Sequence, residues 1–205
     1  MKFLFAALAV CLCLPLQAEV LRDEVTFESD WPSLPLTDPL LFLLDPGEHS
    51  CPGGTYPDCD DANMSITRGL EIYACMGNSV PYDSRVEGTA WIQINGNTDM
   101  DGNGVGWGVF KLVPSVNCSE DWLDDPEVYW EGSWQGNRNK VSDDPPLWIE
   151  IIEVVGRGVG GDLEGQKLHA TEVLTSYTRD LIPNELLGID EPESIVHAVI
   201  KSKAE

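Results

Sequence analysis

The stretch INGNTDMDGNG, residues Ile94–Gly104, carries oxygen-bearing side chains at the alternate positions Asn97, Asp99 and Asp101. Amide and carboxylate oxygens at this spacing, followed by glycine, form the first half of a calcium-binding EF-hand loop. The twelfth position counted from Asn97 is Gly108, which offers no carboxylate, and both flanks are predicted strands rather than helices. Asn, Asp and Gly are also typical of tight turns. The stretch therefore predicts a hairpin turn first, with weak calcium binding as the alternative.

Tryptophan is concentrated in the predicted strands, and the sequence WEGSWQG places Trp130 and Trp134 on one face of a strand. The first expectation for these two rings is packing in the core. A barrel mouth walled by tryptophan with a few polar groups is also typical of a site for an apolar ligand. The polar candidates for such a site are Gln135, Arg157 and His169. If the tryptophan face points outward instead, stacking against a carbohydrate becomes the expected use.

Catalytic motifs are not found. The chain has neither a Gly-x-Ser-x-Gly nucleophile turn nor a His-Glu-x-x-His zinc motif. Glu131 together with Glu150 or Glu153 could form a carboxylate pair across neighbouring strands, which would suit acid/base chemistry. The alternation of half-exposed strands favours outward positions for these three side chains. The sequence therefore favours binding over catalysis.

The N-terminal sequence MKFLFAALAVCLCLPLQA is typical of a secretory signal peptide over residues 1–18. It has one lysine, an apolar run over Phe3–Leu14, a break at Pro15 and a small residue, Ala18, before the expected first mature residue, Glu19. The apolar run is shorter than the roughly 20 residues that span a bilayer. We expect a secreted protein, extracellular or periplasmic, with no membrane span.

Four cysteines follow the signal peptide: Cys51, Cys59, Cys75 and Cys118. An even number in a secreted chain predicts two disulfides, with three possible connectivities. The short loop CPGGTYPDC favours Cys51–Cys59, which leaves Cys75–Cys118. A zinc site is disfavoured because there is no Cys-x-x-Cys pair and no histidine nearby in the sequence.

The formal net charge of the chain is −23, with 35 acidic and 12 basic residues. A protein with this charge is repelled by nucleic acids and by anionic membrane surfaces. The acids are scattered rather than gathered in a tail, so solubility is their ordinary role, and cations or basic molecules are the partners that the charge suits.

Six segments rich in β-branched and aromatic residues, separated by turn sequences, predict strands. Period-two alternation is clear in the second and fifth of them. The segments are 66–76, 86–94, 106–113, 127–136, 147–156 and 163–177. The Pro-rich and acidic residues 19–63 read as an irregular N-terminal extension, 64–177 as the β domain, and 178–205 as a C-terminal tail.

Glycines recur inside the predicted strands, where their usual roles are bends, bulges and close approach of another chain. Repeated bends allow an antiparallel sheet to curl shut. We expect an antiparallel β-barrel, with a β-sandwich as the fallback. In the tail, the apolar stripe Ile195, Val196, Val199 and Ile200 predicts a short helix that starts near Pro192 or Ser194.

The segments YDSRVEGTAWIQI, GWGVFKLV, VYWEGSWQG and GRGVGGDLEGQKLHATEV resemble the small secreted barrels of the allene oxide cyclase-like and dirigent-like type, over roughly residues 66–177. The resemblance implies a barrel with glycines at bends and tryptophans in the core, and it makes a homo-oligomer a partner to test for. Members named for enzymes isomerise or couple small hydrophobic compounds in the barrel mouth. Their catalytic residues have no match here, so none is carried over.

Three hypotheses follow from the sequence. The leading one is a secreted barrel that binds a small apolar or carbohydrate ligand without catalysis. The second is an isomerase- or dirigent-like enzyme, which predicts that His169, Arg157 or Glu131 points into a cavity. The third is a structural or interaction barrel with a filled interior.

Overall fold

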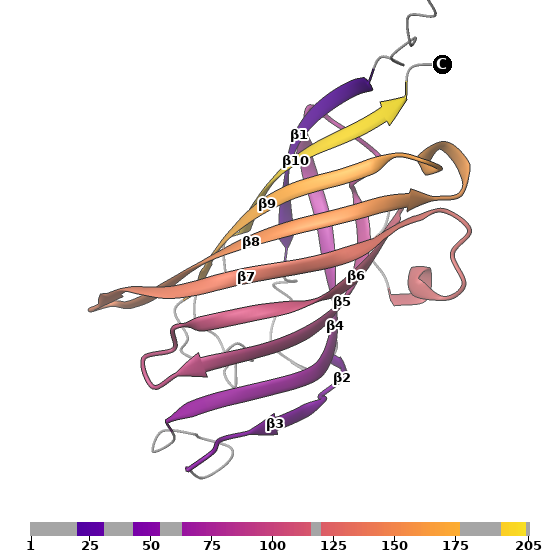
Figure 1. Ribbon diagram of the computed structural model, residues 1–205. Helices are drawn as coiled ribbons and strands as arrows, with labels where there is room; N and C mark the ends of the chain where they lie inside the picture. The colour runs from indigo at the N-terminus through magenta and orange to yellow at the C-terminus, as the bar shows by residue number, and fades with distance from the viewer. Residues whose placement is uncertain (1–19, 31–42, 54–62, 116–119, 177–193, 204–205) are drawn as a thin grey trace, which may run out of the picture.

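The computed structural model describes residues 20–30, 43–53, 63–115, 120–176 and 194–203 (Figure 1). They form ten strands and two short 3-10 helices. The strands are β1 (Val20–Asp30), β2 (Leu43–Asp45), β3 (Glu48–Ser50), β4 (Met64–Val80), β5 (Gly88–Asp99), β6 (Gly104–Pro114), β7 (Tyr129–Asp143), β8 (Pro146–Val159), β9 (Lys167–Ser176) and β10 (Ser194–Lys203). The 3-10 helices are η1 (Glu120–Leu123) and η2 (Gly161–Leu163).

Eight of the strands form a closed antiparallel ring in the order β1-β10-β9-β8-β7-β6-β5-β4, with β4 pairing back onto β1. The expected β-barrel is confirmed. The ring is uneven, because β1 pairs with only the last part of β4, over Cys75–Val80. The first part of β4 pairs instead with the short strands β2 and β3, which lie together at one end of the molecule (Figure 1).

All six predicted strands are present, as β4 to β9, and most are longer than expected. β7 and β8 continue through residues 137–146, which separate the fourth and fifth predicted strands, and meet at a tight connection between Asp143 and Pro146. Their pairing extends over almost the full length of both strands. The alternation that identified the strands therefore underestimated how far the sheet runs past the apolar segments.

The expectation of an irregular N-terminal extension is wrong over residues 20–30, which form β1. Val25, Phe27 and Ser29 alternate on its inner face, and all three are buried. β1 pairs with β10 along its length and with the end of β4. The ring thus takes one strand from the segment that precedes the predicted β domain.

The expectation of a C-terminal helix is also wrong, because Ser194–Lys203 forms β10. Pairing with β1 and β9 supplies its backbone partners on both sides. Its inner face is Ser194, Val196, Ala198 and Ile200, all buried, which is a period-two pattern. The apolar stripe of a helix was inferred from residues that in fact point to opposite faces of a strand.

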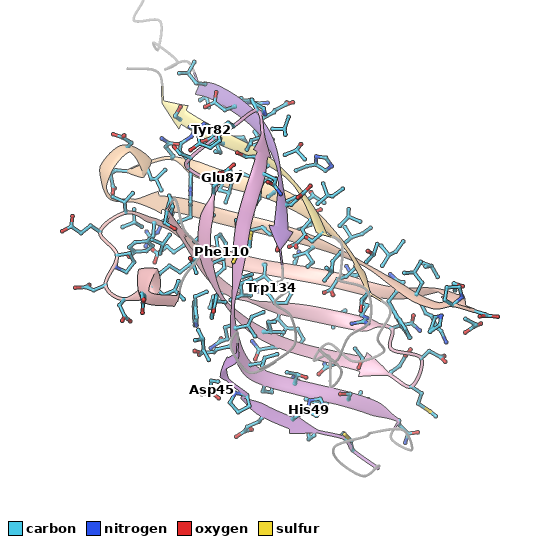
Figure 2. The ribbon with its side chains drawn as sticks, turned by 180° about the vertical axis from the view of Figure 1, so that it is seen from behind. Asp45, His49, Tyr82, Glu87, Phe110 and Trp134 are labelled. Atoms are coloured by element: carbon cyan, nitrogen blue, oxygen red, sulfur yellow. The ribbon has the colours of Figure 1, made fainter. Side chains whose placement is uncertain are left out.

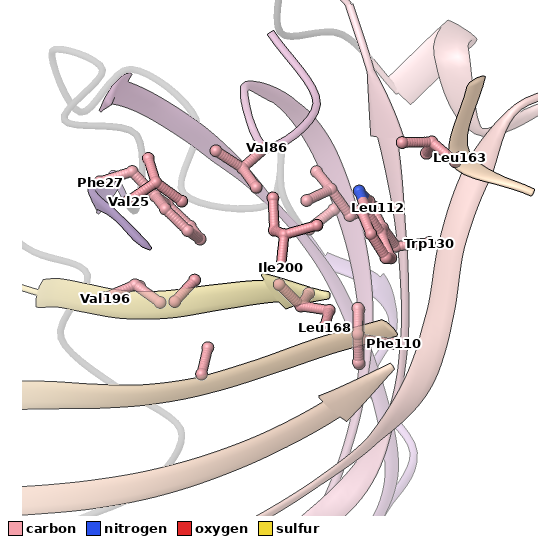
Figure 3. Close-up of a cluster of buried hydrophobic side chains, with 13 residues drawn as sticks. Val25, Phe27, Val86, Phe110, Leu112, Trp130, Leu163, Leu168, Val196 and Ile200 are labelled. Carbon is pink, nitrogen blue, oxygen red and sulfur yellow. The ribbon is translucent and has the colours of Figure 1, made fainter. Parts of the chain in front are cut away.

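One end of the ring, which we call the closed end, is filled by large apolar side chains. Trp130 and Val86 are fully buried, and Leu163 of η2 packs into the same cluster (Figure 3). The Trp130 Nε1–H donates a hydrogen bond to the carbonyl oxygen of Arg85, over 2.7 Å. The cluster comprises Val25, Phe27, Val86, Ala90, Phe110, Leu112, Trp130, Leu163, Leu168, Ala170, Val196, Ala198 and Ile200.

Within the residues that the structure describes, no helix is long and apolar enough to cross a membrane.

Candidate functional site

Beyond the closed end, the interior of the ring holds a cavity of about 140 Å³. Phe110 and Trp134 lie between the closed end, marked by Glu87 and Tyr82, and the β2–β3 end (Figure 2). The apolar wall includes Ile92, Ile94, Phe110, Trp134, Ile152 and Val154. The polar part of the wall is Ser29, Arg138, Glu150, Glu172 and Ser176. A cavity of about 150 Å³ lined by apolar side chains is large enough for benzene, so this one can accept a ring-sized apolar group.

Glu150 is the most unusual residue of the cavity wall. It lies on the inner face of β8 with Trp148 and Ile152, and only 5% of its surface is exposed. In the part of the chain that the structure describes, the Glu150 carboxylate accepts no hydrogen bond. Burial raises its pKa to about 7, Arg138 opposes this rise, and the charge of Glu172 adds to it. A buried carboxyl that stays ionised without hydrogen bonds is costly, so such a group calls for an explanation.

Glu172 is a second inner carboxylate, and its environment differs. It lies on β9 opposite Ile152, two positions along from Leu174, the strand neighbour of Glu150. The hydroxyls of Ser194 and Ser29 donate hydrogen bonds to it, which lowers its pKa, but burial has the larger effect and the pKa is raised. Glu172 is therefore held by its neighbours, whereas Glu150 is not.

Arg138 is the inner cation of this group. It lies on β7 directly opposite Glu150, and it is almost fully buried. Its guanidinium carbon lies 5.4 Å from the centre of the Trp148 ring, and its Nη2 lies 3.5 Å from the Ser176 hydroxyl oxygen. The ring contact is a cation–π interaction, which suits a planar guanidinium. Trp148 is itself fixed by a 2.8 Å hydrogen bond from its Nε1–H to the carbonyl oxygen of Asp101.

Glycines make the space that Glu150 and Trp134 occupy. Gly106 and Gly136 face each other across β6 and β7. A Cβ atom on Gly136 would lie 2.9 Å from Oε1 of Glu150, and one on Gly106 would lie 3.0 Å from the Trp134 ring and 3.3 Å from the same Oε1. Any side chain here would displace them. The Glu150 carboxylate and the Trp134 ring are therefore neighbours, packed against the backbone of Gly106 and Gly136.

The structure separates the five ligand-binding residues expected from the sequence. Trp130 belongs to the closed-end core, and Trp134 lines the cavity and donates from Nε1 to the carbonyl oxygen of Gln93, over 3.1 Å. Gln135, Arg157 and His169 lie exposed on the outer face, so their placement in the barrel mouth is wrong. The physical reason is parity: on a strand next to Trp134, position 135 must point to the opposite side.

The carboxylates considered for a catalytic pair are also divided. Glu131 pairs with Arg157 on the outer face, and Glu153 accepts a hydrogen bond from the Thr171 hydroxyl there, over 3.1 Å. Only Glu150 of the three points inward. Its neighbour in the cavity, Glu172, was not recognised from the sequence, although it alternates in register with the apolar residues Leu168 and Leu174.

The Asn97–Asp101 stretch covers the end of β5 and the start of the hairpin turn that leads to β6 at Gly104. The Asp99 Oδ1 accepts hydrogen bonds from the backbone N–H groups of Asp101 and Asn103, each over 2.9 Å. The side-chain oxygen of Asn97 accepts a hydrogen bond from Arg68, over 2.8 Å. These oxygens are used by the protein, and among the described residues no group of three or more acidic, His or Cys side chains is placed to hold a metal. The geometry agrees with the turn.

Cys51 and Cys75 are each disulfide-bonded. Their predicted partners, Cys59 and Cys118, lie outside the described residues, so the pairings Cys51–Cys59 and Cys75–Cys118 stay predictions. The signal peptide, residues 1–18, also lies outside the described residues.

Comparisons with protein-family models, with curated proteins and with solved structures found no match to this chain. The resemblance to allene oxide cyclase-like and dirigent-like barrels therefore stays a hypothesis.

Proposed function

We propose that this protein is a secreted barrel that binds a small molecule with an apolar body and a polar head in its interior cavity, without catalysis. The single observation that carries the proposal is the Glu150 carboxyl, which is buried at the cavity wall without a hydrogen-bond partner in the described residues. A ligand that donates a hydrogen bond to Glu150 would offset the cost of burying it.

The remaining wall supports an apolar body rather than a sugar. Most of the lining side chains are aliphatic or aromatic, and the polar groups gather at Arg138, Glu150 and Glu172. Ligand sites commonly combine such a wall with a few polar groups that fix orientation. A carbohydrate needs hydrogen-bond partners on several sides, and this wall offers them on one side. A solidly packed structural barrel, the third hypothesis, is disfavoured by the cavity itself.

Filling the cavity tests the proposal. Ala170 lines the cavity from β9, and Val173 points outward from the same strand. Benzyl alcohol binding is measured by calorimetry in the native protein, in Ala170→Leu and in the matched control Val173→Leu. We expect binding by the native protein and the control, and a loss of at least about tenfold in Ala170→Leu, because added methyl groups occupy the ligand volume. Equal binding by all three proteins would contradict a cavity site.

A second candidate is an enzyme that transfers a proton to or from a ligand in the cavity. The observation that favours it is the pKa of Glu150, which burial raises to about 7. A carboxyl with this pKa in an apolar site is suited to general acid/base chemistry near neutral pH. Exchange of deuterium from solvent into carbon positions of a bound ketone, lost in Glu150→Gln, would favour this function over simple binding.

A further inference from the structure

We infer that the cavity selects an organic cation: a small amine whose ammonium group meets Glu150 and Trp134 while its apolar body fills the rest. This inference rests on the proposed function and adds the charge of the ligand to it.

The charge balance of the cavity wall points to a cation. Its ionisable side chains are two carboxylates, Glu150 and Glu172, and one guanidinium, Arg138. When both carboxylates are ionised the wall carries one negative charge in excess, and the raised pKa values of Glu150 and Glu172 show that the empty cavity favours protonating one of them instead. An anionic ligand would add to this excess and a neutral ligand would leave it unchanged. An ammonium group would neutralise it beside side chains that are largely removed from water, where charges interact more strongly than in bulk solvent.

The Glu150 carboxylate is an independent sign of a missing partner. It is more than nine-tenths buried, borders the cavity and accepts no hydrogen bond in the described part of the chain. Glu172, in contrast, is already hydrogen-bonded by two serine hydroxyls. Of the two carboxylates, Glu150 is therefore the one that a ligand can reach, and an ammonium group supplies both the donors and the charge that a carboxylate requires.

Trp134 completes the recognition element. Two carbon atoms of its ring, at 3.0 and 3.1 Å, and Oε1 of Glu150, at 3.3 Å, surround the place where a Cβ of Gly106 would stand. A cation in contact with this carboxylate therefore also lies near an indole ring, which attracts cations through its π electrons. The two groups adjoin the cavity that holds the apolar body.

A proton competes with such a ligand for Glu150. Among the described residues, the charged groups that act on Glu150 are Arg138 on β7 and Glu172 on β9, and the hydroxyls of Ser29 on β1 and Ser194 on β10 bond to Glu172. The cavity-lining side chains of β4, β5 and β6 are apolar. Since the pKa of Glu150 lies at about 7, its carboxyl is protonated in about half of the molecules at neutral pH when the cavity is empty. An ammonium ligand must displace that proton, so its binding strengthens as pH rises.

Calorimetry with benzylamine, benzyl alcohol and benzoate tests the inference on the full mature protein. At about pH 8 we expect benzylamine to bind at least about tenfold more tightly than benzyl alcohol, and benzoate to bind most weakly. Benzylamine affinity is expected to rise about tenfold from about pH 6 to pH 8, because Glu150 loses its proton over this range, whereas benzyl alcohol affinity stays level.

Two variants assign the effect. Glu150→Gln keeps the shape and removes the charge, and it is expected to abolish both the preference for benzylamine and the pH dependence. Glu153→Gln, on the outer face of the same strand, is the matched control and is expected to behave as the native protein. If Glu150→Gln is poorly folded, Glu172→Gln is the alternative variant, because it removes the other inner acid. It is expected to lower the ratio of benzylamine affinity to benzyl alcohol affinity at least about twofold.

Each result decides a different point. Equal affinities for benzylamine and benzyl alcohol in the native protein would overturn the cation inference and leave the binding function standing. Tightest binding of benzoate would overturn it in favour of Arg138 as the recognition group. No binding of any of the three compounds would overturn the proposed function as well.

Discussion

The closed end and the cavity of this barrel are built from the same strands, yet they differ in whether their buried polar atoms are hydrogen-bonded. At the closed end the Trp130 Nε1–H is hydrogen-bonded to the carbonyl oxygen of Arg85, and Trp130, Val86, Leu163 and Ile200 are buried against one another. Around the cavity, only a few residues further along β7 and β8, the Glu150 carboxyl has no such partner and space remains beside it. The first arrangement is what stability requires. The second is costly without a ligand, and this contrast is the basis for placing function in the cavity.

Replacing one tryptophan in each region by alanine should give the largest difference in the free energy of unfolding between the closed end and the cavity. Trp130→Ala removes a fully buried ring from the closed end and is expected to lower the free energy of unfolding by about 3–5 kcal/mol. Trp134→Ala removes a half-buried ring that already borders a cavity, so its cost should be smaller, about 2 kcal/mol. Urea unfolding of both variants measures the difference, and a larger loss for Trp134→Ala would contradict this assignment of the two regions.

The next effect is a dependence of stability on pH that comes from Glu150. Its pKa is raised in the folded state to about 7, so its contribution to stability is complete below the unfolded pKa and is lost as pH rises through 7. Glu150→Gln should therefore be more stable than the native protein at about pH 8, by about 3 kcal/mol, with little difference at about pH 4. Urea unfolding at both pH values tests this.

Glu172, whose pKa is also raised, leaves part of the pH dependence in the Glu150→Gln variant. Glu153→Gln serves as the control and should follow the native protein at every pH. A native protein whose stability is constant from about pH 5 to pH 8 would show that Glu150 is not buried in its charged form.

The ion pairs of Arg85 at the closed end should contribute less to the free energy of unfolding than the protonation of Glu150 does. Arg85 contacts Asp83 through two nitrogens, at 2.9 and 2.6 Å, and it reaches Asp23 at 2.9 Å. The hydrogen-bonded guanidinium lowers the pKa of Asp83. Arg85→Met should cost about 1–2 kcal/mol, because the group is partly exposed and water screens the charges. Repeating the unfolding measurement in high salt should reduce this difference, and an unchanged difference would argue for lost packing instead.

The smallest effect is expected at the β5–β6 turn. Asp99→Ala removes the acceptor of two backbone N–H groups and should cost about 1 kcal/mol. Asp101→Ala, in the same exposed turn, should cost less than about 0.5 kcal/mol. Adding calcium to about 10 mM should leave the unfolding temperature of the native protein unchanged, since half of an EF-hand ligand set is missing. A calcium-dependent rise that Asp99→Ala abolishes would restore the metal-site interpretation.

The sequence predicted the architecture better than the site. Alternation and glycine content identified six strands and the barrel, because side-chain period and bends are local properties of the chain. β1 and β10 were missed, since acidic residues interrupt the apolar pattern in Val20–Asp30 and a short apolar stripe fits two periods in Ser194–Lys203. Only pairing with distant strands decides between those periods.

The errors at the site have one origin. A shift of one position reverses the face of a strand, so grouping Gln135 with Trp134 placed an outer side chain inside the barrel. Glu150 shares a face with the buried Trp148 and Ile152, so the outward position expected for it is wrong. Polar side chains are nevertheless expected to face water, so only the closed ring reveals that Glu150 and Glu172 share one interior.

The most direct measurement is an NMR titration of the Glu150 side-chain carboxyl carbon, assigned by its absence in Glu150→Gln, with and without benzyl alcohol. Our account predicts a midpoint near pH 7, as burial requires, and a change of its chemical shift when the alcohol enters the cavity. A midpoint near the ordinary value of about 4.3, with no response to the alcohol, would contradict a buried carboxyl at a ligand site.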